Sequence, residues 1–161
     1  MTQMNTIDVK DFVTNAIMDV FDTMLSMQME PADLGSVKAE DGNRIVGSVS
    51  FAGKLMGSMN IHVSEQFARI MTAAMLGMEL EEIESNEDIY DVIGELSNMV
   101  GGDLKSRFCD AGLTCELSIP SITKGTDFKI EPQDWARHEC FAFRMKKDVA
   151  LVEVYMKTDQ T

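Results

Sequence analysis

The sequence lacks a long hydrophobic run. No apolar stretch in its 161 residues approaches the roughly 18 residues needed to cross a bilayer. The first residues carry no basic patch followed by an apolar segment, so no signal peptide is expected and the protein is predicted to be cytoplasmic. The length fits one domain covering residues 1–161, with a core that needs neither a disulfide nor a structural metal.

Basic residues are scarce. The chain has 14 Lys and Arg against 27 Asp and Glu, which gives a net charge of −13. Such a chain is repelled by the phosphate backbone of nucleic acids and by an anionic membrane surface, so neither is expected as a partner. Most of the negative charge is interpreted as an aid to solubility, and the acidic stretch 79–88 as a solvated loop rather than a metal site.

Cysteine and histidine are also rare. The three cysteines, Cys109, Cys115 and Cys140, are odd in number and form no Cys-x-x-Cys pair. They therefore predict neither a disulfide framework nor a zinc site, and we expect free thiols. The two histidines, His62 and His138, are interpreted as ordinary residues of a strand and a strand edge.

Two periodicities organise the chain. Apolar residues recur at helical spacing in three segments, 8–29, 64–77 and 88–108. Strands are predicted at 44–51, 54–63, 114–119, 139–146 and 150–156. Short turns make hairpins of the first pair and the last pair, and the Pro- and Gly-containing segment 120–133 is expected to be a loop. This order predicts an α+β fold with a largely antiparallel sheet and helices packed on one face.

The third helical segment separates polar from apolar residues. At about 100° per residue, Asp91, Glu95, Asn98, Gly102 and Lys105 fall on one polar stripe, opposite the apolar side. Glu95 and Asn98 are then adjacent, one turn apart, on the exposed face. On spacing alone, the simplest interpretation of such a pair is a solvated helix surface.

Three glycines lie inside this helical pattern. Gly94, Gly101 and Gly102 should each cost about 1 kcal/mol relative to alanine in a helix interior. Their missing side chains would let another surface approach Glu95 and Asn98. Close packing against another part of the same chain would explain them equally well.

The segment Gly94–Lys105 resembles the signature helix of the CheC/CheX/FliY chemotaxis phosphatases. That signature has Asp or Ser, three residues, Glu, two residues, Asn, and then a pair of small residues or glycines. Asp91, Glu95 and Asn98 match it position by position, and 118–125 resembles the strand and Pro…Gly loop that follow it in the family. The family usually has Asn after the glycine pair, where this chain has Asp103. We interpret Asp103 as structural, hydrogen-bonded to a neighbouring turn. A single copy of the signature favours the CheX type.

The resemblance implies a phosphatase that acts on the phospho-aspartate of a CheY-like response regulator. Asn98 would hold a water molecule in line with phosphorus, and Glu95 would contact the regulator's lysine. Asp91, Gly94, Gly101 and Gly102 would support them. The regulator would supply the Mg²⁺, and this chain would bind no metal or cofactor of its own. The sequence has no nucleophilic triad, metal-ligand cluster or phosphate loop, in keeping with such a mechanism.

One alternative is a non-catalytic module. FliM shares this fold without the phosphatase residues, so the resemblance also allows a binding or scaffold role in chemotaxis or motility. The presence of both Glu95 and Asn98 favours the enzyme. By the same resemblance we expect a homodimer that forms through strand or helix pairing.

Overall fold

An antiparallel sheet forms one layer of the computed structural model, which describes residues 7–36, 43–126 and 137–158. The described strands follow the order β1-β6-β7-β3-β2-β4, and β5 also pairs with β2. Their bounds are Glu30–Ala32 (β1), Arg44–Gly53 (β2), Leu55–Ser64 (β3), Cys115–Leu117 (β4), Ser121–Gly125 (β5), Arg137–Met145 (β6) and Asp148–Thr158 (β7). Every strand pair is antiparallel.

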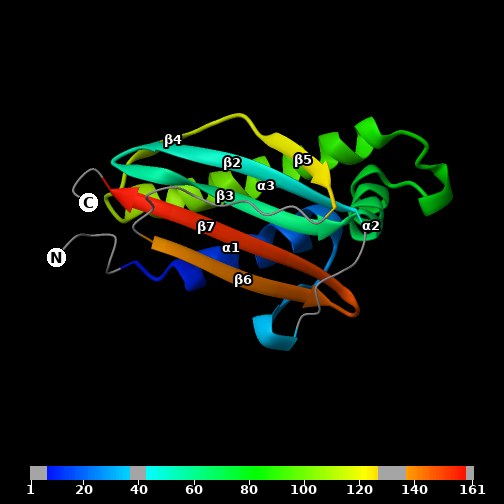
Figure 1. Cartoon of the computed structure of the whole chain (residues 1–161), viewed down its shortest axis with the longest axis horizontal. Coiled ribbons are helices and arrows are strands. Elements are labelled where there is room, and N and C mark those ends of the chain that lie inside the picture. Colours follow the sequence, from blue (N-terminus) through cyan, green and yellow to red (C-terminus); the bar gives the residue numbers. More distant parts are fainter. Residues whose placement is uncertain (1–6, 37–42, 127–136, 159–161) are drawn as a thin grey trace.

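The helices form the second layer. They are α1 (Val9–Leu25), α2 (Glu65–Leu76) and α3 (Asn86–Asp110). In Figure 1, α1 and α3 lie behind the sheet and α2 lies at its right-hand end. Two short 3₁₀ turns, η2 (Leu34–Ser36) and η3 (Leu80–Glu82), complete the described elements. The predicted α+β fold, with helices on one face of an antiparallel sheet, is therefore confirmed. None of the described helices is both long enough and apolar enough to span a membrane.

The core lies between the two layers. In the β2–β3 hairpin, Ile45 pairs with Val63 and Val49 with Met59, and all four side chains are buried toward the helices. The alternate residues of both strands face the other side of the sheet, as the period of two predicts. The long helix α3 packs across β2 and also contacts α1 and α2. The hairpin thus forms the platform on which α3 lies.

Helix α1 is shorter than the sequence pattern predicts. Asp8 caps it by accepting a hydrogen bond from the Asp11 backbone N–H, and the helix ends at Leu25 instead of near residue 29. Ser26 adopts a left-handed conformation (φ 54°) that stops the helix. Pro31 lies in the short strand β1 at the edge of the described sheet, a position where proline is tolerated.

The prediction of a loop at 120–133 is wrong for the first part of that segment. Ser121–Gly125 forms strand β5, while residues 127–136 lie outside the described residues. Strands β4 and β5 follow each other along β2, with Leu117 opposite Phe51 and Ser121 opposite Ser48. Three residues thus face two across this gap, which is a bulge, and Pro120 within it has no N–H to offer a ladder. The proline interrupts the strand without ending it.

Candidate functional site

The polar stripe predicted on the third helical segment lies on the exposed side of α3. The apolar residues of this helix, Ile89, Val92, Ile93, Leu96 and Val100, are buried between the layers. On the opposite side, Asp91 and Glu95 are exposed and Asn98 is half-buried. The structure therefore brings the three matched residues together on one accessible surface.

The three polar side chains have no partner within the described part of the chain. No hydrogen bond or ion pair there involves the carboxylates of Asp91 and Glu95 or the amide of Asn98. Their neighbour Ser97 behaves differently, because it is buried and donates a hydrogen bond to the Ile93 carbonyl at 2.8 Å. The three matched side chains thus present two carboxylates, which accept hydrogen bonds, and one amide, which can both donate and accept.

The three glycines of α3 have different surroundings. A Cβ on Gly101 would lie 2.7 Å from Cγ2 of Val49, so Gly101 permits close packing of the helix on the sheet. A Cβ on Gly94 would make ordinary contacts with Pro120 and Ile122, whereas one on Gly102 would meet nothing within 4 Å. Packing within the chain therefore explains Gly101, and only Gly102 faces open space.

The β4–β5 segment forms a wall beside the polar stripe. At one end, Lys105 on α3 donates a hydrogen bond to Glu116 at 3.2 Å. Further along, Gly101 faces Leu117 and Gly94 faces Pro120. The wall therefore runs antiparallel to α3, with its bulge at the level of Asn98, between the Gly94 and Gly101 contacts.

Asp103 belongs to the packing of the helices and not to the polar stripe. Its carboxylate accepts a hydrogen bond from Nε of Arg107 at 2.6 Å, one turn further along α3. The same guanidinium lies 3.7 Å from the Asp19 carboxylate on α1. The prediction of a structural role, with a bond to a neighbouring turn, is confirmed.

The described residues contain no group of His, Cys, Asp and Glu side chains that could hold a metal ion. All three cysteines are free thiols, and burial raises the pKa of the Cys115 thiol to about 11. In the acidic stretch 79–88, the exposed acidic residues are Glu79, Glu81, Glu82, Glu84 and Glu87.

The two histidines lie in strands, but sequence reasoning missed their neighbours. His62 contacts the Glu153 carboxylate, and His138 stacks on Tyr155 with ring centroids 4.3 Å apart. The Tyr155 hydroxyl donates a hydrogen bond to Glu153 at 2.7 Å. Glu153 follows His62 by 91 residues, so only strand pairing brings them together.

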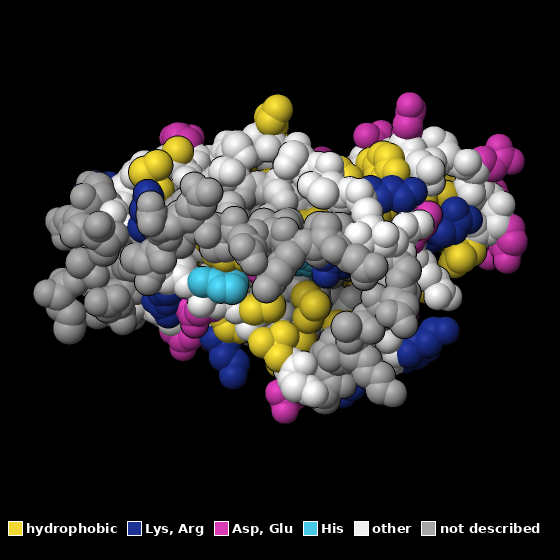
Figure 2. Space-filling view, in the orientation of Figure 1, with side chains coloured by type: hydrophobic (Ala, Val, Ile, Leu, Met, Phe, Trp, Pro, Cys, Tyr) yellow, Lys and Arg dark blue, Asp and Glu magenta, His cyan; other side chains and the backbone are white. Residues whose placement is uncertain are grey.

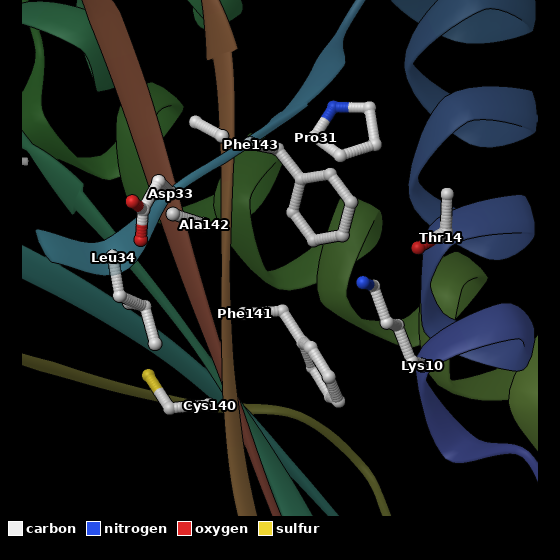
Figure 3. Close-up of a pocket in the computed structure, with 10 residues that line it drawn as sticks. Lys10, Thr14, Pro31, Asp33, Leu34, Cys140, Phe141, Ala142 and Phe143 are labelled. Atoms are coloured by element: carbon white, nitrogen blue, oxygen red, sulfur yellow. The ribbon is translucent and has the colours of Figure 1, made fainter. Parts of the chain in front are cut away.

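A cavity of about 510 Å³ lies at the other edge of the sheet, between α1, β1 and β6. Phe141 and Phe143 point from β6 toward Lys10 and Thr14 of α1, as Figure 3 shows. Strands β7, β3 and β2 separate this cavity from the wall formed by β4 and β5. It contains none of the predicted site residues, so it does not belong to the α3 site.

Comparison with known families identifies the class of protein that this fold and helix define. Residues 45–145, well over half of the chain, match the family described as "Chemotaxis phosphatase CheX". The matched region includes all of α3 and the β4–β5 wall. The chain therefore belongs to the CheX family.

One curated relative is the "CheY-P phosphatase CheX" of Thermotoga maritima. It is 30% identical over 88 residues, which are 54% of this chain and 56% of that protein. The chain thus matches little more than half the length of this relative.

Two solved structures extend the likeness to nearly the whole chain. The chemotaxis protein CheX from Vibrio vulnificus has a TM-score of 0.79 at 23% identity, covering 94% of this chain and 97% of that one. The CheX chain of a CheX–CheY–BeF₃–Mg²⁺ complex from Borrelia burgdorferi has a TM-score of 0.74 at 19% identity, covering 94% and 99%. At these identities the two structures show the shared fold.

Proposed function

We propose that this protein is a phosphatase that hydrolyses the phospho-aspartate of a CheY-like response regulator. The observation that carries the proposal is the α3 stripe of a CheX-family chain, where Asp91, Glu95 and Asn98 are accessible and have no partner among the described residues. Polar side chains that the fold does not use are available to a second protein. The reaction would take place in the cytoplasm, where such regulators act.

In this mechanism, Asn98 acts on the attacking water. Its amide oxygen accepts a hydrogen bond from the water, and its N–H group can donate one to a phosphoryl oxygen. The water oxygen bonds to phosphorus as the bond from phosphorus to the aspartate oxygen breaks, which yields aspartate and inorganic phosphate. Phosphoryl transfer depends mainly on positioning and charge stabilisation, so no nucleophile is needed from this chain.

Glu95 is proposed to bind the regulator. An exposed carboxylate one turn from Asn98 can pair with a lysine beside the phosphorylated pocket, and that pair would align the two proteins. The regulator would supply the Mg²⁺, as the complex from Borrelia burgdorferi contains CheY, BeF₃ and Mg²⁺ together with CheX. Asp91, one turn before Glu95, would support the orientation of that carboxylate.

Asn98→Ala tests the chemistry. Without the amide, dephosphorylation of a phosphorylated CheY-like regulator should slow by about a hundredfold or more, equivalent to about 2.7 kcal/mol in the barrier. Thermal unfolding should be nearly unchanged, since the amide bonds to none of the described residues. Asn86→Ala is the matched control, an exposed Asn in the first turn of the same helix. Undiminished turnover in Asn98→Ala would refute the mechanism.

Glu95→Ala tests the docking role. Binding to the beryllofluoride form of the regulator should weaken about tenfold, with a smaller effect for Glu87→Ala, which removes an equally exposed carboxylate nearer the start of α3. The non-catalytic scaffold predicts a different pattern, with regulator binding but no phosphate release even from the native protein.

We also propose a homodimer. On β6, residues 142–144 pair with β1, whereas 138–141 pair only with β7 among the described strands. An open strand edge can add a strand from a second copy. Light scattering should give twice the chain mass, and a monomer at micromolar concentration would contradict the proposal.

A further inference from the structure

One exposed hydrophobic residue differs from the others. Ile119 exposes 88% of its surface, while the other large exposed hydrophobic residues expose between 38% and 47%. Single surface hydrophobics need no special explanation in general. Ile119, however, lies on the wall beside the polar stripe, and the backbone holds it outward.

The bulge between β4 and β5 places Ile119 outside the sheet. Three residues, Ser118, Ile119 and Pro120, face only two residues of β2, so the extra length of chain is displaced outward. Figure 2 shows a hydrophobic side chain projecting from the rim above the segment between β4 and β5. The exposure of Ile119 therefore follows from strand register and not from a disordered loop.

Ser118 holds the bulge in place through both its backbone and its side chain. Its N–H donates to the Ser50 carbonyl at 2.9 Å, and its Oγ accepts from the Ser50 N–H at 2.9 Å. The same hydroxyl can donate to the carbonyl of Ile119 at 3.0 Å. A side chain on a backbone held in this way loses little conformational freedom when a partner binds, which favours affinity.

Ile119 lies at the level of the catalytic candidates. Pro120 contacts the position of Gly94 and Leu117 that of Gly101, so Ile119 lies along α3 between these two glycines, in the interval that contains Glu95 and Asn98. One turn beyond Asn98, Gly102 faces open space. Ile119 therefore lies at the edge of the surface that presents the polar stripe.

We infer that Ile119 is an apolar anchor for the response regulator, and this inference rests on the proposed function. The occupant is the regulator's apolar surface beside its phosphorylated pocket, because the wall and the stripe form one continuous surface. The matched residues Asp91, Glu95 and Asn98 present two carboxylates and one amide, which supply specificity but little apolar area. Burial of a projecting isoleucine would provide that area at the edge of the site.

The experiment compares three variants by binding and by turnover. Ile119→Ser should raise both the Kd for a beryllofluoride-activated CheY-like regulator and the KM for its phosphorylated form about tenfold. The effect should fall on KM more than on kcat, because Ile119 touches no reacting group. Ile119→Leu should restore near-native values. Met56→Ser is the control, since Met56 is 42% exposed on the sheet face opposite the helices.

The possible results separate the two proposals. Unchanged Kd and KM in Ile119→Ser, with an active native protein, would overturn the anchor and leave the phosphatase standing. A native protein that binds the activated regulator through Ile119 but releases no phosphate would refute the phosphatase and support the anchor. If the native protein neither binds nor dephosphorylates any regulator of its host, both proposals fail.

Discussion

On the outer face of the sheet, which is the face opposite the helices, a group of polar side chains around Glu153 is joined by hydrogen bonds. The matched polar side chains of α3, in contrast, bond to no other described residue. Glu153 is the centre of the outer group, where it contacts His62 and accepts a hydrogen bond from Tyr155 at 2.7 Å. Nearby, Ser48 donates a hydrogen bond to Asn60 at 2.6 Å across β2 and β3. On α3, by contrast, Glu95 and Asn98 are accessible and form no hydrogen bond or ion pair with any described residue.

The difference follows from burial. His62 and Asn60 are only 6% and 4% exposed, and buried polar groups without partners are costly, so pairing there serves the fold. Glu95 is exposed, and its solvated carboxylate needs no partner in the free protein. Carboxylates of similar chemistry thus stabilise the fold on one face and remain open to solvent on the other.

The ionisation of Glu153 reflects its network. Burial by itself would raise the pKa of Glu153, but the hydrogen bonds from His62 and Tyr155 and the charges of His62 and His138 hold that pKa below its ordinary value. The ionised carboxylate therefore stabilises the folded state, and protonation of Glu153 should weaken the network.

The largest loss of stability should occur in Glu153→Ala, on the face of the sheet opposite the helices. Removing the carboxylate leaves His62 and the Tyr155 hydroxyl without this acceptor, and the free energy of unfolding should fall by about 2 to 3 kcal/mol. Turnover of phosphorylated regulator, measured below the melting transition, should stay near native because α3 covers the opposite face. Glu95→Ala should show the reverse, with weak binding and native stability.

The stability that the Glu153 carboxylate contributes on the outer face of the sheet should depend on pH. Because the folded pKa of Glu153 lies below the ordinary value of 4.5, its stabilisation should be fully present above pH 4.5 and be lost as the pH falls through the folded pKa. Denaturant unfolding of the native protein and Glu153→Gln should therefore give a stability gap that narrows as the pH falls below 4.5. A gap that widens in acid would contradict this account.

Smaller changes in stability are expected when the adjacent glycines Gly101 and Gly102 are replaced by alanine. In Gly101→Ala the new Cβ meets Val49, a stiff β-branched side chain, and overpacking should outweigh the gain in helix propensity by about 1 kcal/mol. In Gly102→Ala the Cβ meets nothing within 4 Å, so the free energy of unfolding should rise by up to about 1 kcal/mol. Thermal melts of both variants would measure the two shifts, and equal shifts would show that the packing of α3 on β2 does not distinguish them.

Local patterns were sufficient to predict α3 and its stripe. A helix repeats every 3.6 residues, so the relative directions of Asp91, Glu95 and Asn98 follow from their spacing alone. The predicted hairpins are also confirmed, because adjacent strands joined by a short turn need only local chain reversal. The roles of Glu95 and Asn98, in contrast, remain predictions taken from the family signature.

The sequence by itself determined the helical stripe, the order of the three helices and of the five predicted strands, and the family signature, because each depends on residues close together in the chain. Only the tertiary structure decided that Ser121–Gly125 is a strand, that Ile119 is displaced outward, and that Glu153 meets His62. It also assigned Gly101 to packing and Gly102 to open surface. The physical reason is that strand register and layer packing join distant segments, and no local periodicity records which segments will meet.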